Sequence, residues 1–209
     1  MKNMIAAVQL HILISKIKKK NQTFVLGFDG FGGSGKTTLA NDYKRLIEKE
    51  GLRVTLLHLD DIIRKKQDRY NTSFPEWYEY YYLQWDVGYI RQQILEPLQK
   101  SGFLDSYIQF YDKNLDQHYE KKVVVPEKSV CMIEGVFLQR EEWRPYFDFV
   151  YFVDCGKDKR LKRILKRDTY IGNVAEIVRK YEVRYFPAEE YYEKKRNPKS
   201  LANEVIVNT

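Results

Sequence analysis

The sequence predicts an α/β fold in which a five-stranded parallel sheet is covered by helices on both faces and carries an inserted β-hairpin. Short apolar runs alternate with helix-length segments, as the crossover connections between parallel strands require. The runs contain few polar residues, which is typical of strands that are buried on both faces. The five runs are residues 23–28, 54–59, 130–134, 148–153 and 204–207.

Ahead of the first strand, residues 1–22 are expected to form an amphipathic helix that docks on the domain. Ile5, Val8, Ile12 and Leu13 follow roughly helical spacing, and a run of lysines closes the segment. The apolar stretch is too short to cross a bilayer and has no clear cleavage site. A helix that lies on a membrane surface is the alternative that this pattern leaves open.

Two helices are expected between the strands. Residues 36–50 repeat apolar side chains at helical spacing, and Gly51 supplies a C-terminal stop. A second helix covers about residues 85–96, and Pro97 is expected to end or bend it. The preceding segment, residues 74–85, is dense in tyrosine and tryptophan, which indicates packing, with a ring-stacking platform as the alternative.

Residues 101–126 change to a period of two, which predicts an antiparallel hairpin between the second helix and the third strand. Leu104, Ser106, Ile108 and Phe110 share one face, and the polar stretch 112–117 supplies the turn. Such an insert either walls a substrate pocket or covers a sheet edge, and the pattern does not choose between the two.

The strongest local signal is the segment GFGGSGKTT, which directly follows the first strand and opens the first core helix. Its spacing fits the phosphate-binding pattern G-x-x-x-x-G-K-[ST], in which glycines let backbone N–H groups surround a phosphate chain. Lys36 is expected to neutralise the β- and γ-phosphates, and the Thr37 hydroxyl to hold Mg²⁺. This motif predicts a P-loop NTPase fold with ATP and Mg²⁺ as cofactors. The expected ATP-binding residues are Gly30, Phe31, Gly32, Gly33, Ser34, Gly35, Lys36, Thr37 and Thr38.

Length and composition indicate one domain with a sizeable core, since the chain has 209 residues. The formal net charge of +7 indicates anionic ligands, but charge alone does not separate phosphate esters from nucleic acid or a membrane. Cys131 and Cys155 have no CxxC partner, so we expect two reduced packing residues in a cytoplasmic protein.

Two acidic residues follow apolar strands at the edge where ligands bind in open α/β sheets. Asp60 ends the second strand, where a carboxylate is placed to accept a proton from an attacking hydroxyl or to hold the metal's water shell. The neighbouring Asp61 fits a helix N-cap better. Glu134 ends the third strand before Gly135 and is expected to position Mg²⁺ together with Thr37 and Asp60.

The segment 158–168 reads DKRLKRILKRD and forms part of an expected lid at about residues 157–175. On a helix, Arg160, Arg163 and Arg167 share one face, and guanidinium groups suit the oxygens of a transferring phosphoryl group. A solvated basic helix is the alternative.

Together these motifs resemble the uridine kinase branch of P-loop kinases, which includes phosphoribulokinase-like and pantothenate kinase-like enzymes. The resemblance extends over about residues 23–207 and implies that residues 23–209 form a P-loop kinase domain. It implies that Asp60 is the base, and that Lys36, Arg163 and Arg167 stabilise charge on the phosphoryl group. It also implies that Tyr111 of the hairpin and Arg184 of the last helix contact the acceptor together with Asp60.

The departures from this family concern the acceptor. The family's D-S-F-Y after the second strand is replaced by Asp60-Asp61-Ile62-Ile63, and its N-F-D-H-P segment has no clean match in EWYEYYYLQWD. Asp116 stands where a histidine is expected after the hairpin tyrosine, and residues 169–174 lack the lid's further arginines. The expected activity is therefore transfer of the ATP γ-phosphate to a hydroxyl of a nucleoside or another small molecule.

A second class of function is a nucleotide switch or an ATPase that acts with nucleic acid or a protein partner, suggested by the excess of lysine and arginine. The guanine-reading motif N-K-x-D and any recognisable nucleic-acid module are missing from the sequence. The expected partner is therefore a small-molecule acceptor rather than nucleic acid. The sequence leaves open whether the chain acts as a monomer or as a homo-oligomer.

Overall fold

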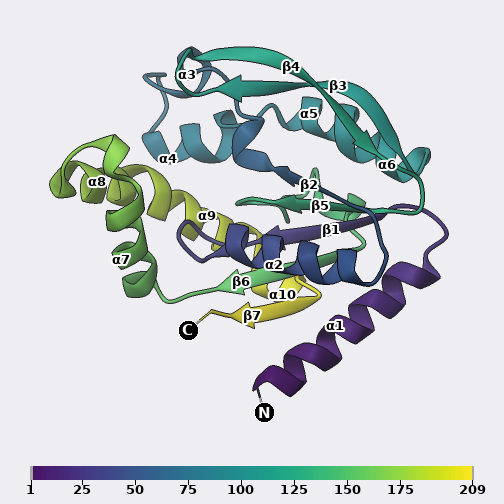
Figure 1. Cartoon of the computed structure of the whole chain (residues 1–209). Helices are drawn as coiled ribbons and strands as arrows, with labels where there is room; N and C mark the ends of the chain where they lie inside the picture. Colours follow the sequence, from purple (N-terminus) through teal and green to yellow (C-terminus); the bar gives the residue numbers. More distant parts are fainter. Residues whose placement is uncertain (1, 209) are drawn as a thin grey trace.

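A computed structural model describes residues 2–208, with side chains from residue 9 onward. Its centre is a parallel five-stranded sheet in the order β2-β5-β1-β6-β7 (Figure 1). The strands are β1 (Phe24–Asp29), β2 (Val54–His58), β5 (Val130–Glu134), β6 (Phe149–Asp154) and β7 (Glu204–Val207). All five expected strands are present, which confirms the predicted sheet.

The predicted hairpin is also confirmed. Strands β3 (Leu104–Asp112) and β4 (Gln117–Val125) pair antiparallel and form a separate two-stranded sheet. Leu104, Ile108 and Phe110 are buried, as the period of two predicts for one face. The hairpin lies beyond β2 on the outer side of the core, above α5 and α6 in Figure 1. The Thr55 hydroxyl of β2 donates a hydrogen bond to the Val124 carbonyl oxygen at 3.0 Å, so the hairpin covers this edge of the sheet.

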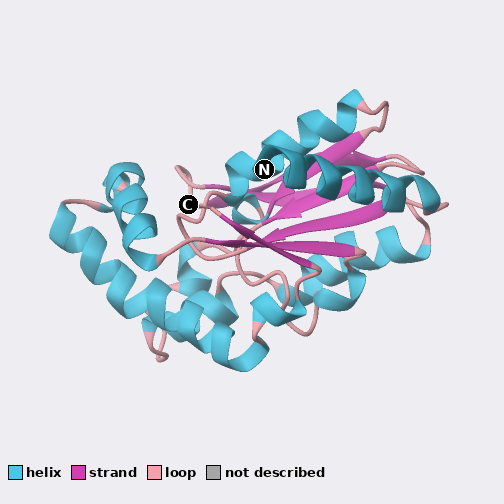
Figure 2. Ribbon diagram, turned by 90° about the horizontal axis from the view of Figure 1, so that it is seen from below, coloured by secondary structure: helices cyan, strands magenta, loops and turns pink. Residues whose placement is uncertain are grey.

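Helices lie on both faces of the sheet, as Figure 2 shows. Their bounds are α1 (Lys2–Lys19), α2 (Lys36–Lys49), α3 (Lys66–Arg69), α4 (Glu76–Tyr78), α5 (Val87–Ile90), α6 (Glu96–Lys100), α7 (Lys157–Arg167), α8 (Val174–Lys180), α9 (Phe186–Arg196) and α10 (Pro198–Leu201). Wide π-type turns at Glu79–Leu83, Arg91–Leu95 and Tyr181–Tyr185 continue α4, join α5 to α6 and join α8 to α9.

The second predicted helix ends later than expected. The prediction placed its end or bend at Pro97, but the helical run continues through the proline to Lys100. A proline ring inside an α-helix clashes with the carbonyl four residues earlier. The wide turn Arg91–Leu95 directly precedes this point and gives the ring room, since a π-type turn displaces those carbonyls.

The N-terminal helix α1 packs on the face that also carries α2. Leu13, Ile14 and Ile17 are buried in one cluster with side chains of β1 and α2, whereas Ile12 is 50% exposed. The side chains of Ile5 and Val8, which the prediction also assigned to the apolar face, lie outside the described part. Among the described residues, no helix has the length and apolar character that crossing a membrane requires.

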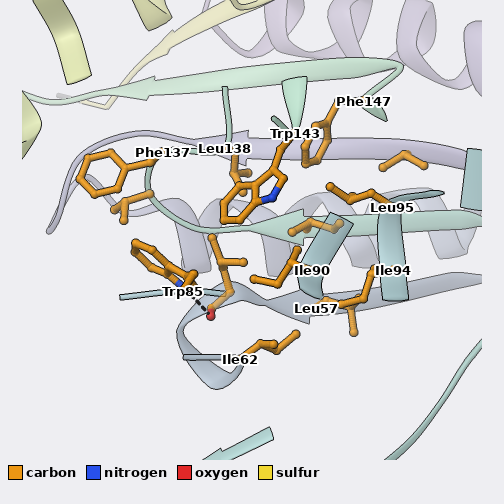
Figure 3. Close-up of a cluster of buried hydrophobic side chains, with 14 of the residues drawn as sticks. Leu57, Ile62, Trp85, Ile90, Ile94, Leu95, Phe137, Leu138, Trp143 and Phe147 are labelled. Carbon is orange, nitrogen blue, oxygen red and sulfur yellow. Dashed lines mark hydrogen bonds between the residues drawn. The ribbon is translucent and has the colours of Figure 1, made fainter. Parts of the chain in front are cut away.

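The opposite face carries the larger core, which is built around Trp85 and Trp143. Both indoles are 1% exposed, and Trp85 packs edge-on against Phe137 at a centroid distance of 6.0 Å (Figure 3). The Trp85 Nε1–H donates to the Leu59 carbonyl oxygen at 3.0 Å. This bond fixes the helical turn Leu59–Asp61 that follows β2. Asp61 lies inside that turn and not at a helix N-cap, so the capping role predicted for it is wrong.

We expect Trp85→Phe to lower the free energy of unfolding by about 1–2 kcal/mol, because it removes packed ring volume and the indole N–H bond to the Leu59 carbonyl, which then keeps only the bond from the Ile62 N–H. Urea unfolding followed by circular dichroism measures this change. Trp77→Phe is the matched control, since Trp77 is only partly buried against the same core. A control that is destabilised as much as Trp85→Phe would contradict the importance of the Leu59 bond.

Candidate active site

The phosphate-binding loop connects the end of β1 to the start of α2 and depends on three glycines. Gly30, Gly33 and Gly35 have φ angles of 147°, 75° and 96°, which residues with side chains rarely adopt. A Cβ atom on Gly30 would lie 2.6 Å from the Val153 carbonyl oxygen. Glycine is therefore required for the backbone to curl in front of α2, whose N-terminus carries the positive end of the helix dipole.

Lys36 is the first residue of α2 and is 8% exposed. Its Nζ donates a hydrogen bond to the Phe31 carbonyl oxygen at 3.0 Å, so the ammonium group lies inside the curl of the loop. Burial lowers the pKa of Lys36, whereas the charges of Glu134 and Asp60, and to a smaller extent those of Asp29 and Glu189, raise it. The loop thus holds a desolvated cation that is surrounded by negative charge.

The sheet register places Glu134 of β5 between β1 and β2, opposite Phe28 on one side and His58 on the other. The Glu134 carboxylate accepts a hydrogen bond from the Thr37 hydroxyl at 3.1 Å and lies 2.7 Å from His58 Nδ1. Burial alone would raise the pKa of Glu134, but the bond to His58 and the Lys36 charge lower it below its usual range. The same bond raises the pKa of His58. Glu134 is therefore held as a carboxylate.

Thr37 and Glu134 offer the hard oxygen atoms that Mg²⁺ prefers. Within residues 2–208, no group of three or more His, Cys, Asp and Glu side chains is placed to hold a metal ion. The donor set fits an ion bound through one or two protein oxygens, with phosphate and water supplying the rest, as is usual for Mg²⁺ beside a nucleotide.

Asp60 lies in the turn after β2 that Trp85 holds. Its side chain remains exposed, but the surrounding protein displaces part of its hydration. This desolvation raises the pKa of Asp60, the nearby Glu134 carboxylate raises it further, and Lys36, Lys113 and Arg167 oppose the shift. Asp60, Glu134 and Lys36 thus come together at the carboxyl edge of the sheet from three different segments.

The three arginines of α7 share a helix face but have different partners. Arg163 donates to the carbonyl oxygens of Gly33 and Ser34 at 3.3 and 3.2 Å, so it braces the loop from outside. Arg167 pairs with Asp168 at 2.6 Å and its side chain is 61% exposed. Its charge also acts on Asp60.

Arg160 corrects the expectation that all three guanidinium groups face the phosphates. It is 5% exposed and pairs with Glu189 of α9 at 2.9 Å. Arg160 Nη1 also donates to the Gly32 carbonyl oxygen, while the Glu189 carboxylate accepts from the Gly32 N–H at 2.8 Å. The ion pair thus holds both polar groups of one loop residue, which makes it a brace for the loop backbone.

Sequence reasoning missed the residues that support the loop from behind. Asp29 is fully buried and accepts hydrogen bonds from the Tyr192 hydroxyl at 2.6 Å, the Gln139 amide at 3.1 Å and the Gly30 N–H at 2.8 Å. Burial raises the pKa of Asp29, and these bonds oppose the shift. Its place immediately before the glycine motif was an available signal, but its partners are far away in the sequence.

Glu189→Gln is expected to lower the free energy of unfolding by about 2 kcal/mol, because it leaves the buried Arg160 charge without its counterion. Glu190→Gln is the matched neighbour, since the side chain of Glu190 is 61% exposed and its nearest cation, Lys157, is 3.9 Å away. We expect a change below about 0.5 kcal/mol for that control. Chemical denaturation of both variants measures the difference, and equal effects would rule out the brace.

The remaining acceptor residues that the resemblance implied lie in strand β3 of the hairpin and in the turn that joins α8 to α9. Tyr111 is buried, and its hydroxyl donates to Asp116 at 2.8 Å. Arg184 is 0% exposed and pairs with Glu79 at 2.8 Å. The Arg184 side chain therefore presents no surface to a ligand in this structure, so it acts by holding its neighbours in place.

On the other side of the loop, the ends of β6 and β7 border an open cavity. It has a volume of about 410 Å³ and is lined by Asp154–Lys159, Val207 and Asn208. The Asn208 side chain donates to the Ser34 carbonyl oxygen at 2.7 Å, which places this cavity directly beside the loop. Because the strand order is β2-β5-β1-β6-β7, the cavity and Asp60 lie on opposite sides of the loop.

The chain is similar to known kinases in sequence and in structure. The uridine kinase of Bacillus pumilus is 30% identical over 154 residues, which cover 72% of this chain and 70% of that protein. The uridine kinase of Staphylococcus epidermidis is 29% identical over 153 residues, covering 71% and 70%. A solved structure described as a possible uridine kinase from Bacillus stearothermophilus is 37% identical, with a TM-score of 0.78 and coverage of 96% and 98%. No family model matches the sequence.

The fold and the loop define a P-loop kinase, a phosphotransferase class that uses a nucleotide as donor. Within this class, the chain belongs to the uridine kinase-like family.

Proposed function

We propose that the protein transfers the γ-phosphate of MgATP to a hydroxyl group of a nucleoside or another small molecule. The convergence of Lys36, Asp60 and Glu134 beside the glycine loop carries this proposal. It brings the Lys36 ammonium and the Asp60 and Glu134 carboxylates to the same edge of the sheet, and this supports the roles proposed for them toward the phosphates, the acceptor and the metal. Such a site accelerates phosphoryl transfer by positioning and electrostatics.

In this proposal the loop amides and Lys36 bind the β- and γ-phosphates. The nucleoside part of ATP occupies the cavity between the ends of β6 and β7, because that cavity adjoins the loop and lies away from Asp60. The acceptor enters from the opposite side, where β2 and β5 end and the hairpin covers the edge.

Thr37 and Glu134 would hold Mg²⁺, which neutralises phosphate charge when bound. His58 keeps the Glu134 carboxylate oriented through their 2.7 Å contact. Arg163 keeps the loop in shape through its bonds to Gly33 and Ser34, and the charge of Arg167, whose guanidinium pairs with Asp168, acts on Asp60 beside the transferring group.

Asp60 orients the acceptor hydroxyl and accepts its proton as the bond to phosphorus forms. Its position at the carboxyl edge of the sheet, and its place in the positive field of Lys36, Lys113 and Arg167, support this role. The nucleoside kinases among the relatives make a nucleoside one candidate acceptor.

The alternative of a nucleic-acid-dependent ATPase has little support from α7. Arg160 and Arg163 are used in contacts to Glu189 and to the loop, so the basic helix does not present them as a free surface.

Calorimetry with MgATP, followed by an ADP-release assay over nucleosides, sugars, glycerate-like acids and pantothenate-like alcohols, tests the proposal. We expect heat of binding with MgATP and acceptor-dependent ADP release. Binding without release for any acceptor, combined with hydrolysis stimulated by DNA or RNA, would replace the kinase with the ATPase alternative.

A further inference from the structure

Three cations gather around one tyrosine on the acceptor side of the site. The Arg184 guanidinium lies 4.0 Å from the centre of the Tyr70 ring, the Arg69 guanidinium lies 4.8 Å from it and Lys180 Nζ lies 5.3 Å from it. These residues come from three segments: Arg69 and Tyr70 from the end of α3, Lys180 from the end of α8, and Arg184 from the turn that follows. We call Arg69, Tyr70, Lys180 and Arg184 the cationic cluster.

The carboxylates paired with the cluster are too few to neutralise its three positive charges. Arg184 pairs with Glu79 at 2.8 Å, whereas neither Arg69 nor Lys180 has a carboxylate within ion-pair distance among residues 9–208. Arg69 is nevertheless only 5% exposed, and it donates hydrogen bonds to neutral acceptors, the Arg64 carbonyl and the Gln84 amide oxygen.

One further carboxylate, Asp116, acts on Arg69 from a distance. Asp116 is itself bound to the Lys66 N–H and to the Tyr111 hydroxyl, and the Lys66 charge acts on it as well. Positive charge therefore remains in excess. Buried charge without a counterion is costly, so a built site of this kind is best explained by an anion that arrives with a ligand.

The pKa of Tyr70 reflects the same excess of positive charge. Burial raises the pKa of a phenol, but the charges of Arg184, Lys180 and Arg69 outweigh burial and lower the pKa of Tyr70. The position of its hydroxyl therefore favours a negatively charged oxygen. Tyr70 is half-buried, so part of its side chain is reachable from solvent.

A wall of tyrosines connects the cluster to Asp60. The Tyr80 ring lies 4.7 Å from the Tyr185 ring and 5.7 Å from the Arg184 guanidinium, and the Asp60 charge acts on its hydroxyl. Tyr170, just after α7, is influenced by both Tyr70 and Asp60. Tyr80 and Tyr170 therefore lie between the cluster and the proposed base, since both sense the Asp60 charge and both neighbour cluster residues.

We propose that the acceptor carries an anionic group, a carboxylate or a phosphate ester, which binds at Lys180 and Arg69 of the cationic cluster, with the buried Arg184 contributing its charge, while the acceptor hydroxyl lies at Asp60. This inference rests on the proposed kinase function and narrows its acceptor to negatively charged alcohols. It also explains why the residues that face uridine in the family are missing here. An uncharged nucleobase carries no negative group that could pair with the cationic cluster. Arg69 and Lys180 become the residues that set specificity.

The first test measures anion binding without turnover. Inorganic phosphate is titrated by calorimetry into protein saturated with MgADP, which fills the glycine loop. We expect Lys180→Met to weaken phosphate binding about tenfold, since it removes one charge-assisted contact. Lys195→Met is the matched control, because Lys195 Nζ lies 5.4 Å from the Tyr82 and Tyr191 rings, away from the cluster.

The second test compares matched acceptors in the ADP-release assay: glycerate with glycerol, ribose 5-phosphate with ribose, pantothenate with its alcohol, and uridine alone. The anionic member of at least one pair should have a kcat/KM about tenfold or more above its neutral member. Lys180→Met should raise the KM for that anionic acceptor while leaving its kcat and the KM for ATP nearly unchanged. The carboxylate and phosphate pairs identify which anion the cluster prefers.

The outcomes separate the two proposals. Failure of every acceptor overturns the kinase assignment, and phosphate titration then still decides whether the cluster binds anions. Turnover of uridine or neutral alcohols as efficient as that of the anionic members overturns the anionic acceptor and leaves the kinase intact. Phosphate binding that is absent, or that Lys180→Met and Lys195→Met weaken equally, overturns the cluster.

Discussion

Lys36→Ala is expected to lower kcat/KM for MgATP by on the order of a thousandfold. The Lys36 ammonium lies inside the loop curl, 3.0 Å from the Phe31 carbonyl oxygen, where the terminal phosphates of a nucleotide would lie. A bound nucleotide replaces that carbonyl as the partner of the ammonium, and the charge on the transferring group grows as the reaction proceeds. Steady-state ADP release at varied MgATP measures the loss.

Stability separates this effect from misfolding. Burial lowers the pKa of Lys36, so its charged form is held at a cost in the unliganded protein, and alanine should change the free energy of unfolding by less than about 1 kcal/mol. Wild-type protein should gain about 2.7 kcal/mol from MgATP at a hundredfold excess over Kd, whereas Lys36→Ala should gain far less at the same concentration. Lys49→Ala, an exposed lysine of the same helix, should match wild type in both respects. Full stabilisation of Lys36→Ala by MgATP would contradict the role given to the ammonium.

The sheet and the loop could be predicted because their signals are local. Apolar runs such as 130–134 identify buried strands without reference to the rest of the chain, and Gly30, Gly33 and Gly35 are required by the backbone angles of a single turn. The period of two in residues 104–110 likewise reports one buried face of the hairpin.

The partners of the site could not be predicted, because they depend on pairings that are distant in the sequence. In the sequence, Arg160 is one member of a basic helix face. Only the folded chain brings Glu189 of α9 within ion-pair distance of it. Asp29 acquires its role from Tyr192, which lies at the far end of the chain. The cationic cluster likewise forms only when α3 meets the end of α8.

The aromatic segment 74–85 is a further case in which the sequence predicted burial but not the role of the individual side chains. Composition predicted packing, and Trp85 and Tyr81 are indeed buried. Composition did not indicate that Trp85 would fix the turn carrying Asp60, or that Tyr80 would join that turn to the cationic cluster. Such roles follow from which backbone or charge a ring meets, and this is set by the sheet order.

Asp60→Asn is expected to lower kcat by a factor on the order of a hundred to ten thousand, because asparagine orients an acceptor hydroxyl but does not take its proton. The neighbouring Asp61→Asn is the matched control, since Asp61 lies in the same turn and has no role in the proposed chemistry. It should change kcat no more than a few-fold. Equal losses in the two variants would remove the basis for treating Asp60 as the base.

The pH dependence gives an independent readout. The proposed base acts when deprotonated, and partial desolvation and the Glu134 charge raise the pKa of Asp60 above its ordinary value of 3.8. Activity should therefore fall as the pH is lowered through this raised pKa. The acid limb of the pH–rate profile should lie above pH 3.8 and be absent from the residual activity of Asp60→Asn.

The pH dependence of stability has the opposite sign. The folded protein holds the Asp60 proton more tightly than the unfolded chain, so this carboxyl group destabilises the fold increasingly as the pH rises through that range. Asp60→Asn should then be at least as stable as wild type at neutral pH while being nearly inactive, and a variant that loses stability along with activity would assign Asp60 to the fold instead.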